Sequence, residues 1–383
     1  MRRRNKQNRN SRHGGVLVLS ALLIVALLGL TAFAIDIGYL CVAKSQAQRS
    51  ADAAVLAGAW ELIDENVAAG GTSAATLETN ARALASQYAG LNEVCGDAPA
   101  LASSDIEVGY IANPFDRSSP MVFNQPANNN AVRVRVRRTS SQNGEVSLFF
   151  ARALGTNSHS VEAEATAVLM GNFSGFRAPG GGSGNLDLLP LALDEVTWNA
   201  MLAGGGSHDW NWYDQASTIT AGTDGVRELN LFPQGTGSPG NRGTVDIGSS
   251  NNSTNDIARQ IVYGVSPSDF AYHGGSLEFD QNGELMLNAD TGISAGVKDE
   301  LASIKGQPRI IPIFSQVSGN GNNAMYTIVK FVGVRILDVK LTGNMNSKRV
   351  IIQPAKFVSG GGIPNTSATQ TTSYIYSPVW LLR

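Results

Sequence analysis

The longest hydrophobic run of the chain lies near its start and carries no charged residue from Val16 to Ile35. As an α-helix with a rise of about 1.5 Å per residue, this run would reach roughly 30 Å, which matches the hydrocarbon core of a bilayer. We therefore predict a transmembrane helix over residues 14–36.

The charges that flank this run indicate its orientation. Basic residues are dense before it, whereas Lys44 and Arg49 are the only basic residues soon after it. The positive-inside bias then places residues 1–13 in the cytoplasm as a basic tail and exports the rest of the chain. We expect a single-pass protein of a bacterial inner membrane, with its bulk on the periplasmic side.

A second interpretation of the same run is a cleaved signal peptide. The Ala-Phe-Ala sequence at residues 32–34 fits an A-x-A processing site, and cleavage after Ala34 would release a soluble product that begins at Ile35. The run exceeds the roughly 7 to 15 residues of a signal h-region, and helical character continues beyond it. Both features favour the uncleaved anchor.

Beyond Asp36 the chain keeps helical spacing and contains no proline as far as about Asp64. Small side chains recur on one face of this predicted helix, which would let another backbone approach closely. We interpret this face as an interaction surface, and its residues are Ala47, Ala51, Asp52, Ala54 and Gly58. The prediction is one rod, half in lipid and half packed on a folded head.

The next segments alternate between helical and strand patterns. We predict a second helix from about Thr72 to Ala89, a short amphipathic helix over residues 147–155, and strands over residues 105–111, 131–138 and 161–170. Along residues 131–138 apolar and basic side chains alternate, so one face of that strand is positive. We favour a solvated edge strand protected by its charge over a contact for an acidic partner or anionic headgroups.

A glycine-rich segment at residues 178–185 indicates a linker between two folded parts. Before it lies an α+β periplasmic domain over residues 37–177, and after it a β-rich C-terminal domain over residues 186–383. In that second part we predict a hairpin around residues 281–283 and core strands over residues 309–314, 325–341 and 349–353, with a bulge near Gly333. The fold class is α+β.

Composition narrows the possible functions. The chain of 383 residues is 43% hydrophobic and 16% charged, and its net charge of −2 gives no basic excess for nucleic acid. Cys41 and Cys95 are the only cysteines, and both are predicted to lie outside the cytoplasm, where disulfides persist. Either they pair, or they remain two partly buried thiols, which we favour because Cys41 lies close to the lipid boundary.

The sequence offers no convincing catalytic, cofactor or metal site. It contains no metal-binding cysteine or histidine spacing, no G-x-S-x-G elbow and no Walker A motif. The G-x-G-x-x-G match at residues 235–240 contains Pro239 and is not followed by a helix pattern, so we interpret it as a loop. Trp210 and Trp212 are candidates for contact with a glycan or protein partner, although such clusters more often fold onto their own core. We predict a protein that is not an enzyme, with no small-molecule substrate evident.

The N-terminal residues also resemble a known family, most strongly over residues 14–60. The resemblance rests on Gly14–Gly15, on AIDIGY at residues 34–39 and on QRSADAAVLAGA at residues 48–59, and it is to the TadG-like proteins of Flp pilus assembly. It implies a structural component of a tight-adherence (Tad) pilus system whose partners are the inner membrane and other Tad/Flp assembly proteins or the pilin.

Two further observations refine this expectation. The glutamate that follows the processing glycine in pilins is missing after Gly15, which favours an assembly or anchoring role over that of a major pilin. The nearest approach to the D-x-S-x-S metal motif of some relatives, at residues 246–250, lacks its middle serine, and we interpret it as a glycine turn. A surface adhesin that uses Trp210 and Trp212, and an envelope hydrolase, are the alternative functions.

Overall fold

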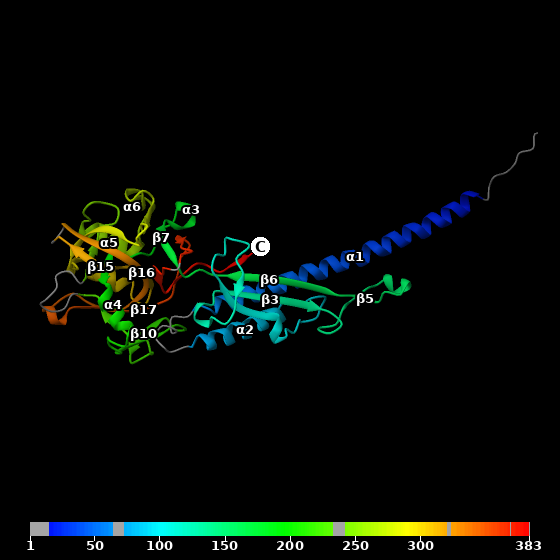
Figure 1. Ribbon diagram of the computed structural model, residues 1–383, viewed down its shortest axis with the longest axis horizontal. Coiled ribbons are helices and arrows are strands. Elements are labelled where there is room, and N and C mark those ends of the chain that lie inside the picture. The colour runs from blue at the N-terminus through cyan, green and yellow to red at the C-terminus, as the bar shows by residue number, and fades with distance from the viewer. Residues whose placement is uncertain (1–14, 64–72, 233–241, 320–322, 368, 383) are drawn as a thin grey trace, which may run out of the picture. The chain divides into compact units, whose positions relative to one another are not determined.

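The computed structural model describes residues 15–63, 73–232, 242–319, 323–367 and 369–382 (Figure 1). These residues form two compact units that interleave along the chain. Unit 1 contains the described residues up to Ala54 together with Ala85–Ile106 and Arg133–Ala165, and unit 2 contains Val55–Leu84, Glu107–Val132 and Thr166–Arg383.

The predicted rod is confirmed as one continuous helix, α1 (Gly15–Trp60), of 46 residues. At 1.5 Å per residue it is about 69 Å long. By length and composition it is able to cross a membrane, and its apolar window is fully exposed. The second predicted helix is α2 (Ala74–Gly90), and the hydroxyl of Ser73 accepts a hydrogen bond from the Thr76 amide at 3.1 Å as its N-terminal cap.

The first sheet contains β1 (Ile106–Ile111), β2 (Met121–Val122), β3 (Ala131–Arg138), β6 (Val161–Val168) and β22 (Trp380–Leu382), in the order β2-β1-β3-β6-β22. The strands predicted at residues 105–111, 131–138 and 161–170 are therefore present. The interpretation of the basic strand as an edge is wrong, because β3 pairs on both sides. The pairing of β22 with β6, which brings the end of the chain to this sheet, has no local signal in the sequence.

The short helix predicted over residues 147–155 is wrong. This segment forms a small hairpin of β4 (Val146–Ser147) and β5 (Ser158–His159), whose tip is the 3-10 turn η3 (Ala151–Leu154). Val146 and Leu148 are buried at a spacing of two, as in a strand. The carboxylate of Asp36 on α1 also accepts hydrogen bonds from the backbone amides at the tip. These amides therefore find their acceptor outside the segment.

The C-terminal part contains an eight-stranded sheet that closes on itself. β15 pairs with β8 on one side and with β16 on the other, so the path β16-β14-β12-β8-β15 returns to β16. The sheet consists of β8 (Leu191–Asp194), β11 (Leu229–Asn230), β12 (Arg242–Val245), β14 (Leu285–Thr291), β15 (Pro308–Ser318), β16 (Ala324–Lys340), β17 (Arg349–Pro354) and β20 (Thr372–Ser373). The three predicted core strands are confirmed as β15, β16 and β17.

Both faces of this sheet are buried, which explains why its strands are nearly continuously hydrophobic. The neighbours Ile310 and Ile311 are fully buried and belong to two different cores. Helices and smaller strands surround the sheet: α3 (Pro179–Gly182), α4 (Glu195–Leu202), α5 (Thr254–Tyr263), α6 (Pro267–Tyr272), α7 (Lys298–Ser303), β7 (Phe173–Arg177), β9 (Trp210–Tyr213), β10 (Thr218–Ala221), β13 (Ser276–Glu278), β18 (Phe357–Val358), β19 (Gly362–Pro364) and β21 (Ile375–Tyr376).

The predicted bulge near Gly333 is misplaced. The register of β16 against β17 shifts between Ile336 and Asp338, beyond the glycine. A Cβ atom on Gly333 would lie 2.4 Å from the carbonyl oxygen of Ala355 and 2.6 Å from that of Tyr374. The glycine is therefore needed because two backbone segments approach it closely.

The predicted hairpin around residues 281–283 is half correct. Its turn closes, because the Asp280 amide donates to the carbonyl oxygen of Glu284 at 2.8 Å. The strands on either side do not pair with each other: β13 pairs with β7, and β14 pairs with β12 and β16. Each strand finds a longer partner in a different sheet, and this outweighs the local hairpin.

Candidate anchoring site on the long helix

The predicted small-residue face of α1 is buried within the protein's own fold. Ala47, Ala51 and Ala54 have no exposed surface, and Gly58 is also buried. Asp52, the fifth predicted interaction residue, is half-buried, and one of its carboxylate oxygens accepts a hydrogen bond from the Gln48 amide at 2.9 Å. Within unit 1, the exposed side of α1 is the side opposite these alanines.

Small residues of α2 meet the buried face of α1. The hydroxyl of Ser50 donates to the carbonyl oxygen of Ala89 at 3.1 Å, which is side-chain-to-backbone contact between the two helices. Ala85 and Ala89 on α2 are fully buried, as Ser50 is on α1. Alanine and serine on both helices allow this close approach, as in other tightly packed helix pairs.

Lys44 and Gln48 of α1 bind the backbone of β6. The Gln48 amide donates to the carbonyl oxygen of Glu164 at 3.0 Å, and the Lys44 ammonium donates to that of Glu162. These two bonds, one helical turn apart, attach side chains of α1 to the main chain of the strand. Lys44 and Gln48 thus fix the helix along the strand.

Asp36, the residue that ends the apolar run, attaches α1 to the tip of the β4–β5 hairpin. Its carboxylate is 4% exposed and accepts hydrogen bonds from the amides of Phe149 at 2.8 Å, Phe150 at 3.1 Å and Ala151 at 2.7 Å. The ring of Tyr39, one turn further, packs edge-on against Phe149 at 5.0 Å between centroids. The helix is therefore bonded to the rest of unit 1 at the point where its apolar half ends.

The turn at Cys95 is a further attachment point. Its amide donates to the side-chain oxygen of Gln46 at 2.7 Å, and a hydrogen bond to Cys95 is the main cause that raises the pKa of the Tyr39 hydroxyl. Both cysteines are free in the structure, with Cys41 exposed and Cys95 partly exposed. The possible disulfide between them stays a prediction.

The arginines of β3 that gave the strand its positive face are paired with acids of unit 1. Arg135 lies 2.6 Å from Glu164, and Arg137 lies 3.3 Å from Asp105. Arg138, at the end of the strand, lies 2.9 Å from Asp97. The alternating arginines of β3 thus form ion pairs with acids on neighbouring segments.

The predicted tryptophan cluster lies on the small sheet of β9 and β10, and both indole side chains are partly exposed. The guanidinium of Arg335, itself 2% exposed, lies 4.1 Å from the centre of the Trp212 ring. The buried carboxylate of Glu228 accepts from the Trp210 amide at 2.7 Å and the Asp209 amide at 3.0 Å. The sequence has no spacing signal for Glu228 or Arg335, and a role of the tryptophans in binding stays a prediction.

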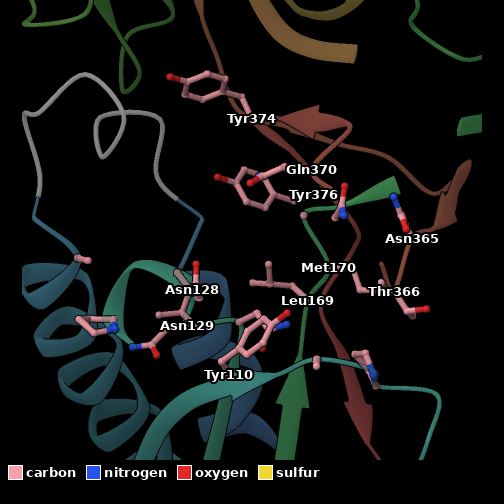
Figure 2. Close-up of a pocket in the computed structure, with 18 of the residues that line it drawn as sticks. Tyr110, Asn128, Asn129, Leu169, Met170, Asn365, Thr366, Gln370, Tyr374 and Tyr376 are labelled. Atoms are coloured by element: carbon pink, nitrogen blue, oxygen red, sulfur yellow. The ribbon is translucent and has the colours of Figure 1, made fainter. Parts of the chain in front are cut away.

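A cavity of about 490 Å³ lies within unit 2 (Figure 2). Its lining is neutral: amides, hydroxyls, tyrosine rings and apolar side chains, without an acidic, basic, histidine or cysteine side chain. Several amides are already used, since Asn130 pairs with the backbone of Ile111 and Asn172 with that of Thr369 and Thr371. The lining therefore provides no carboxylate, imidazole, thiol or amine for acid–base chemistry, and its tyrosine and hydroxyl groups are the ones that could transfer a proton.

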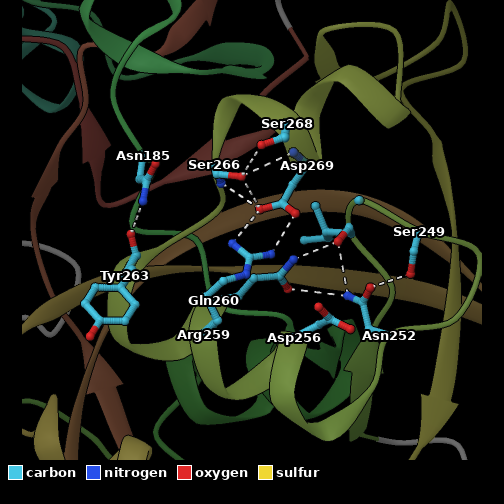
Figure 3. A network of polar contacts seen from close by, with 12 residues as sticks. Asn185, Ser249, Asn252, Asp256, Arg259, Gln260, Tyr263, Ser266, Ser268 and Asp269 are labelled. Carbon is cyan, nitrogen blue, oxygen red and sulfur yellow. Dashed lines mark hydrogen bonds and ion pairs between the residues drawn. The ribbon is translucent and has the colours of Figure 1, made fainter.

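Figure 3 shows a network of polar contacts around α5 and α6, whose role is structural. Arg259 on α5 binds the carboxylate of Asp269 on α6 at 2.7 Å and 3.0 Å. The hydroxyl of Ser266 caps α6 by accepting a hydrogen bond from the Asp269 amide, and the Ser266 amide donates to the same carboxylate. Burial alone would raise the pKa of Asp269, but these hydrogen bonds outweigh burial and lower it. The network joins two helices.

The structure does not support a ligand or metal site at either of the two motifs, residues 235–240 and residues 246–250. The G-x-G-x-x-G match at residues 235–240 lies outside the described residues. At residues 246–250 Gly248 has a φ of +92° and Asp246 is buried, with its carboxylate accepting from the Asn252 amide at 2.8 Å. The described residues contain no group of three or more histidine, cysteine or acidic side chains placed to hold a metal.

The long helix, apolar in its first half and bonded to β6 and other segments of unit 1 in its second, defines an α+β protein whose described residues include one helix long and apolar enough to cross a membrane. Family comparison gives the same result. Residues 14–61 match the family described as putative Flp pilus-assembly TadE/G-like, and residues 57–167 match the family described as putative Tad-like Flp pilus-assembly. Residues 14–167 are thus similar to these Flp pilus-assembly families, which supports the TadG-like resemblance predicted from the N-terminal residues. No curated protein and no solved structure matches it.

Proposed function

We propose that this protein is a membrane-anchored structural component of a Tad Flp pilus system that acts through protein–protein contacts. Its basic tail is cytoplasmic, residues 14–36 cross the bacterial inner membrane, and the remaining chain works on the periplasmic side. Its partners are other Tad/Flp assembly proteins or the pilin. The family matches over residues 14–167 support this assignment.

The observation that carries the proposal is the attachment of α1 to its head. Asp36, Lys44, Gln48 and Ser50 each bind backbone atoms of other segments, so the exported half of the helix is bonded over about four turns. Because these side chains bind backbone atoms, the attachment of the helix does not depend on which side chains the bonded segments carry. Such a helix transmits force between a bilayer and an exported domain, which is what an assembly or anchoring component requires.

The chemistry of the described residues also favours a structural role. The cavity in unit 2 lacks charged side chains, and the polar network of Arg259 and Asp269 joins two helices. An active site for hydrolysis would need convergent acids, bases or a nucleophile in a cleft. The cavity contains hydroxyl groups but no carboxylate, imidazole or thiol to activate them, so we assign no catalytic role.

The proposal is tested by photo-crosslinking in cells. A photoreactive amino acid is placed at Val42 or Arg49, on the exposed side of α1, since Val42 is 51% exposed and both side chains point away from the buried alanines. We expect capture of the Flp pilin or of other Tad assembly proteins, identified by mass spectrometry. The matched control is the same photoreactive residue at Val196 on α4, which is 79% exposed.

The outcomes separate the possibilities. Capture of Tad components from α1 but not from Val196 supports the proposal, whereas capture of lipid or of a second copy alone contradicts it. The mass of the mature chain tests the anchor separately, because cleavage after Ala34 would remove the membrane segment. A strain that lacks the protein should also fail to assemble pili, and normal piliation in that strain would contradict an assembly role.

A further inference from the structure

The tip of the β4–β5 hairpin in unit 1 exposes three large apolar side chains within six residues. Phe149 is 59% exposed, Phe150 47% and Leu154 88%, which is the largest exposure of any large apolar side chain among the described residues. Isolated apolar residues on a surface are ordinary, but a contiguous group at one loop tip indicates a contact.

This tip is folded, so the exposure is not that of a loose loop. Val146 pairs with His159, the Leu148 amide donates to the carbonyl oxygen of Asn157 at 3.0 Å, and the Thr156 amide closes the turn on Ala151 at 3.1 Å. Val146 and Leu148 point inward and are buried. The hairpin thus holds the apolar tip residues outward in a fixed conformation.

The tip is bonded to the end of the apolar run of α1. Asp36 binds the amides of Phe149, Phe150 and Ala151, and Asp36 directly follows the uncharged stretch that ends at Ile35. Figure 1 shows β5 and its loop at the end of the strands nearest the apolar half of α1. If that stretch fills the hydrocarbon core, the tip lies at the depth of the lipid headgroups or just below them.

The charge of the hairpin fits this position. From Val146 to Val161 the chain contains the exposed Arg152 and His159 but no acidic residue. The acids Glu145 and Glu162 flank this stretch, and Glu145 accepts hydrogen bonds from the hydroxyls of Ser158 and Ser160 near the base of the hairpin. Apolar residues that enter the headgroup region, flanked by basic residues that attract anionic lipids, are the usual composition of interfacial membrane contacts.

We propose that the β4–β5 hairpin is a second membrane contact, in which Phe149, Phe150 and Leu154 insert into the interface of a phospholipid bilayer and Arg152 binds its anionic headgroups. The hairpin and α1 then hold the head at two points, which fixes its tilt and its rotation about the helix axis. This inference rests on the proposed membrane anchor, and its occupant is the bilayer that surrounds the protein's own helix.

The test measures the depth of single nitroxide labels in the full chain, reconstituted as one copy per nanodisc of phosphatidylethanolamine and phosphatidylglycerol. Labels are introduced by Leu154→Cys and by Arg152→Cys in a Cys41→Ser, Cys95→Ser background. Collision rates with oxygen, which concentrates in lipid, and with a water-soluble nickel chelate report the depth. Leu30→Cys reports the anchor helix, and Val196→Cys, on an exposed side chain of α4, serves as the reference in water.

We expect the label at position 154 to collide with the nickel chelate several-fold less often than the label at position 196, and position 152 to lie between them. Equal nickel accessibility at positions 154 and 196, with position 30 protected, would overturn the hairpin contact and leave the anchor intact. An accessible position 30 would overturn both. A second preparation with two copies per disc serves as a comparison, and protection of position 154 only in that preparation would show a contact between proteins and would also overturn the proposal.

Discussion

Replacing Ala51 with leucine tests whether the small-residue face of α1 is the surface on which the helix packs. Ala51 has no exposed surface, and its neighbour Ser50 bonds to the α2 backbone at 3.1 Å, so the two helices leave little space for a larger side chain. Ala53 on the same helix is partly exposed. Ala53→Leu is therefore a matched control that adds the same atoms to the same helix.

The expected magnitude follows from the difference between these two positions. Alanine and leucine are both strong helix formers, so the substitution itself changes helix stability little at either site. Overpacking a closed contact costs about 1 to 3 kcal/mol of folding free energy. For a unit of about 100 residues, each kcal/mol lowers the melting temperature by roughly 4 to 8 °C. Ala51→Leu should thus lower the melting temperature by roughly 4 to 24 °C, and Ala53→Leu by much less.

The assay is thermal unfolding of the full chain in nanodiscs, followed by near-ultraviolet circular dichroism and by protease sensitivity of the head. Membrane insertion of α1 should be the same in both variants, because the substitutions lie beyond its apolar half. If Ala51→Leu and Ala53→Leu melted together, the alanine face would not be a packed contact. The assignment of α1 as a helix docked on its own head would then fail.

Three further changes have defined outcomes. Asp36→Asn removes part of the acceptor for three loop amides, so hydrogen exchange at residues 149–151 should accelerate while helix content stays constant; unchanged exchange would contradict the attachment. Glu228→Gln leaves one buried amide of the tryptophan segment without its acceptor, which should cost about 1 to 3 kcal/mol and red-shift tryptophan emission as Trp210 becomes more exposed. Burial lowers the pKa of His273, which accepts a hydrogen bond from the Gly248 amide at 3.2 Å, so its stabilising contribution should be complete above about pH 6.5 and lost as the pH falls through the lowered value. Thermal unfolding against pH measures this, and His273→Gln should flatten that part of the profile.

The sequence by itself determined the local features of this protein. The uncharged run up to Ile35, the helical spacing after Asp36 and the period-two alternation from Ala131 to Arg138 each correspond to one element in the structure. These signals are local, because helix and strand periods are set by which side of a short segment meets water. The family resemblance over residues 14–60 is local in the same sense, since it rests on one continuous stretch.

Only the tertiary structure decided how the elements are used. The sequence could not show that Asp36 binds amides more than one hundred residues away, that β22 completes the first sheet, or that the glycine at 333 faces two approaching backbones. It also gave the wrong partner for β13 and an edge position for β3, because pairing depends on competition among all strands. These choices are long-range: they depend on which buried groups find acceptors and space in the complete fold, and no single segment contains that information.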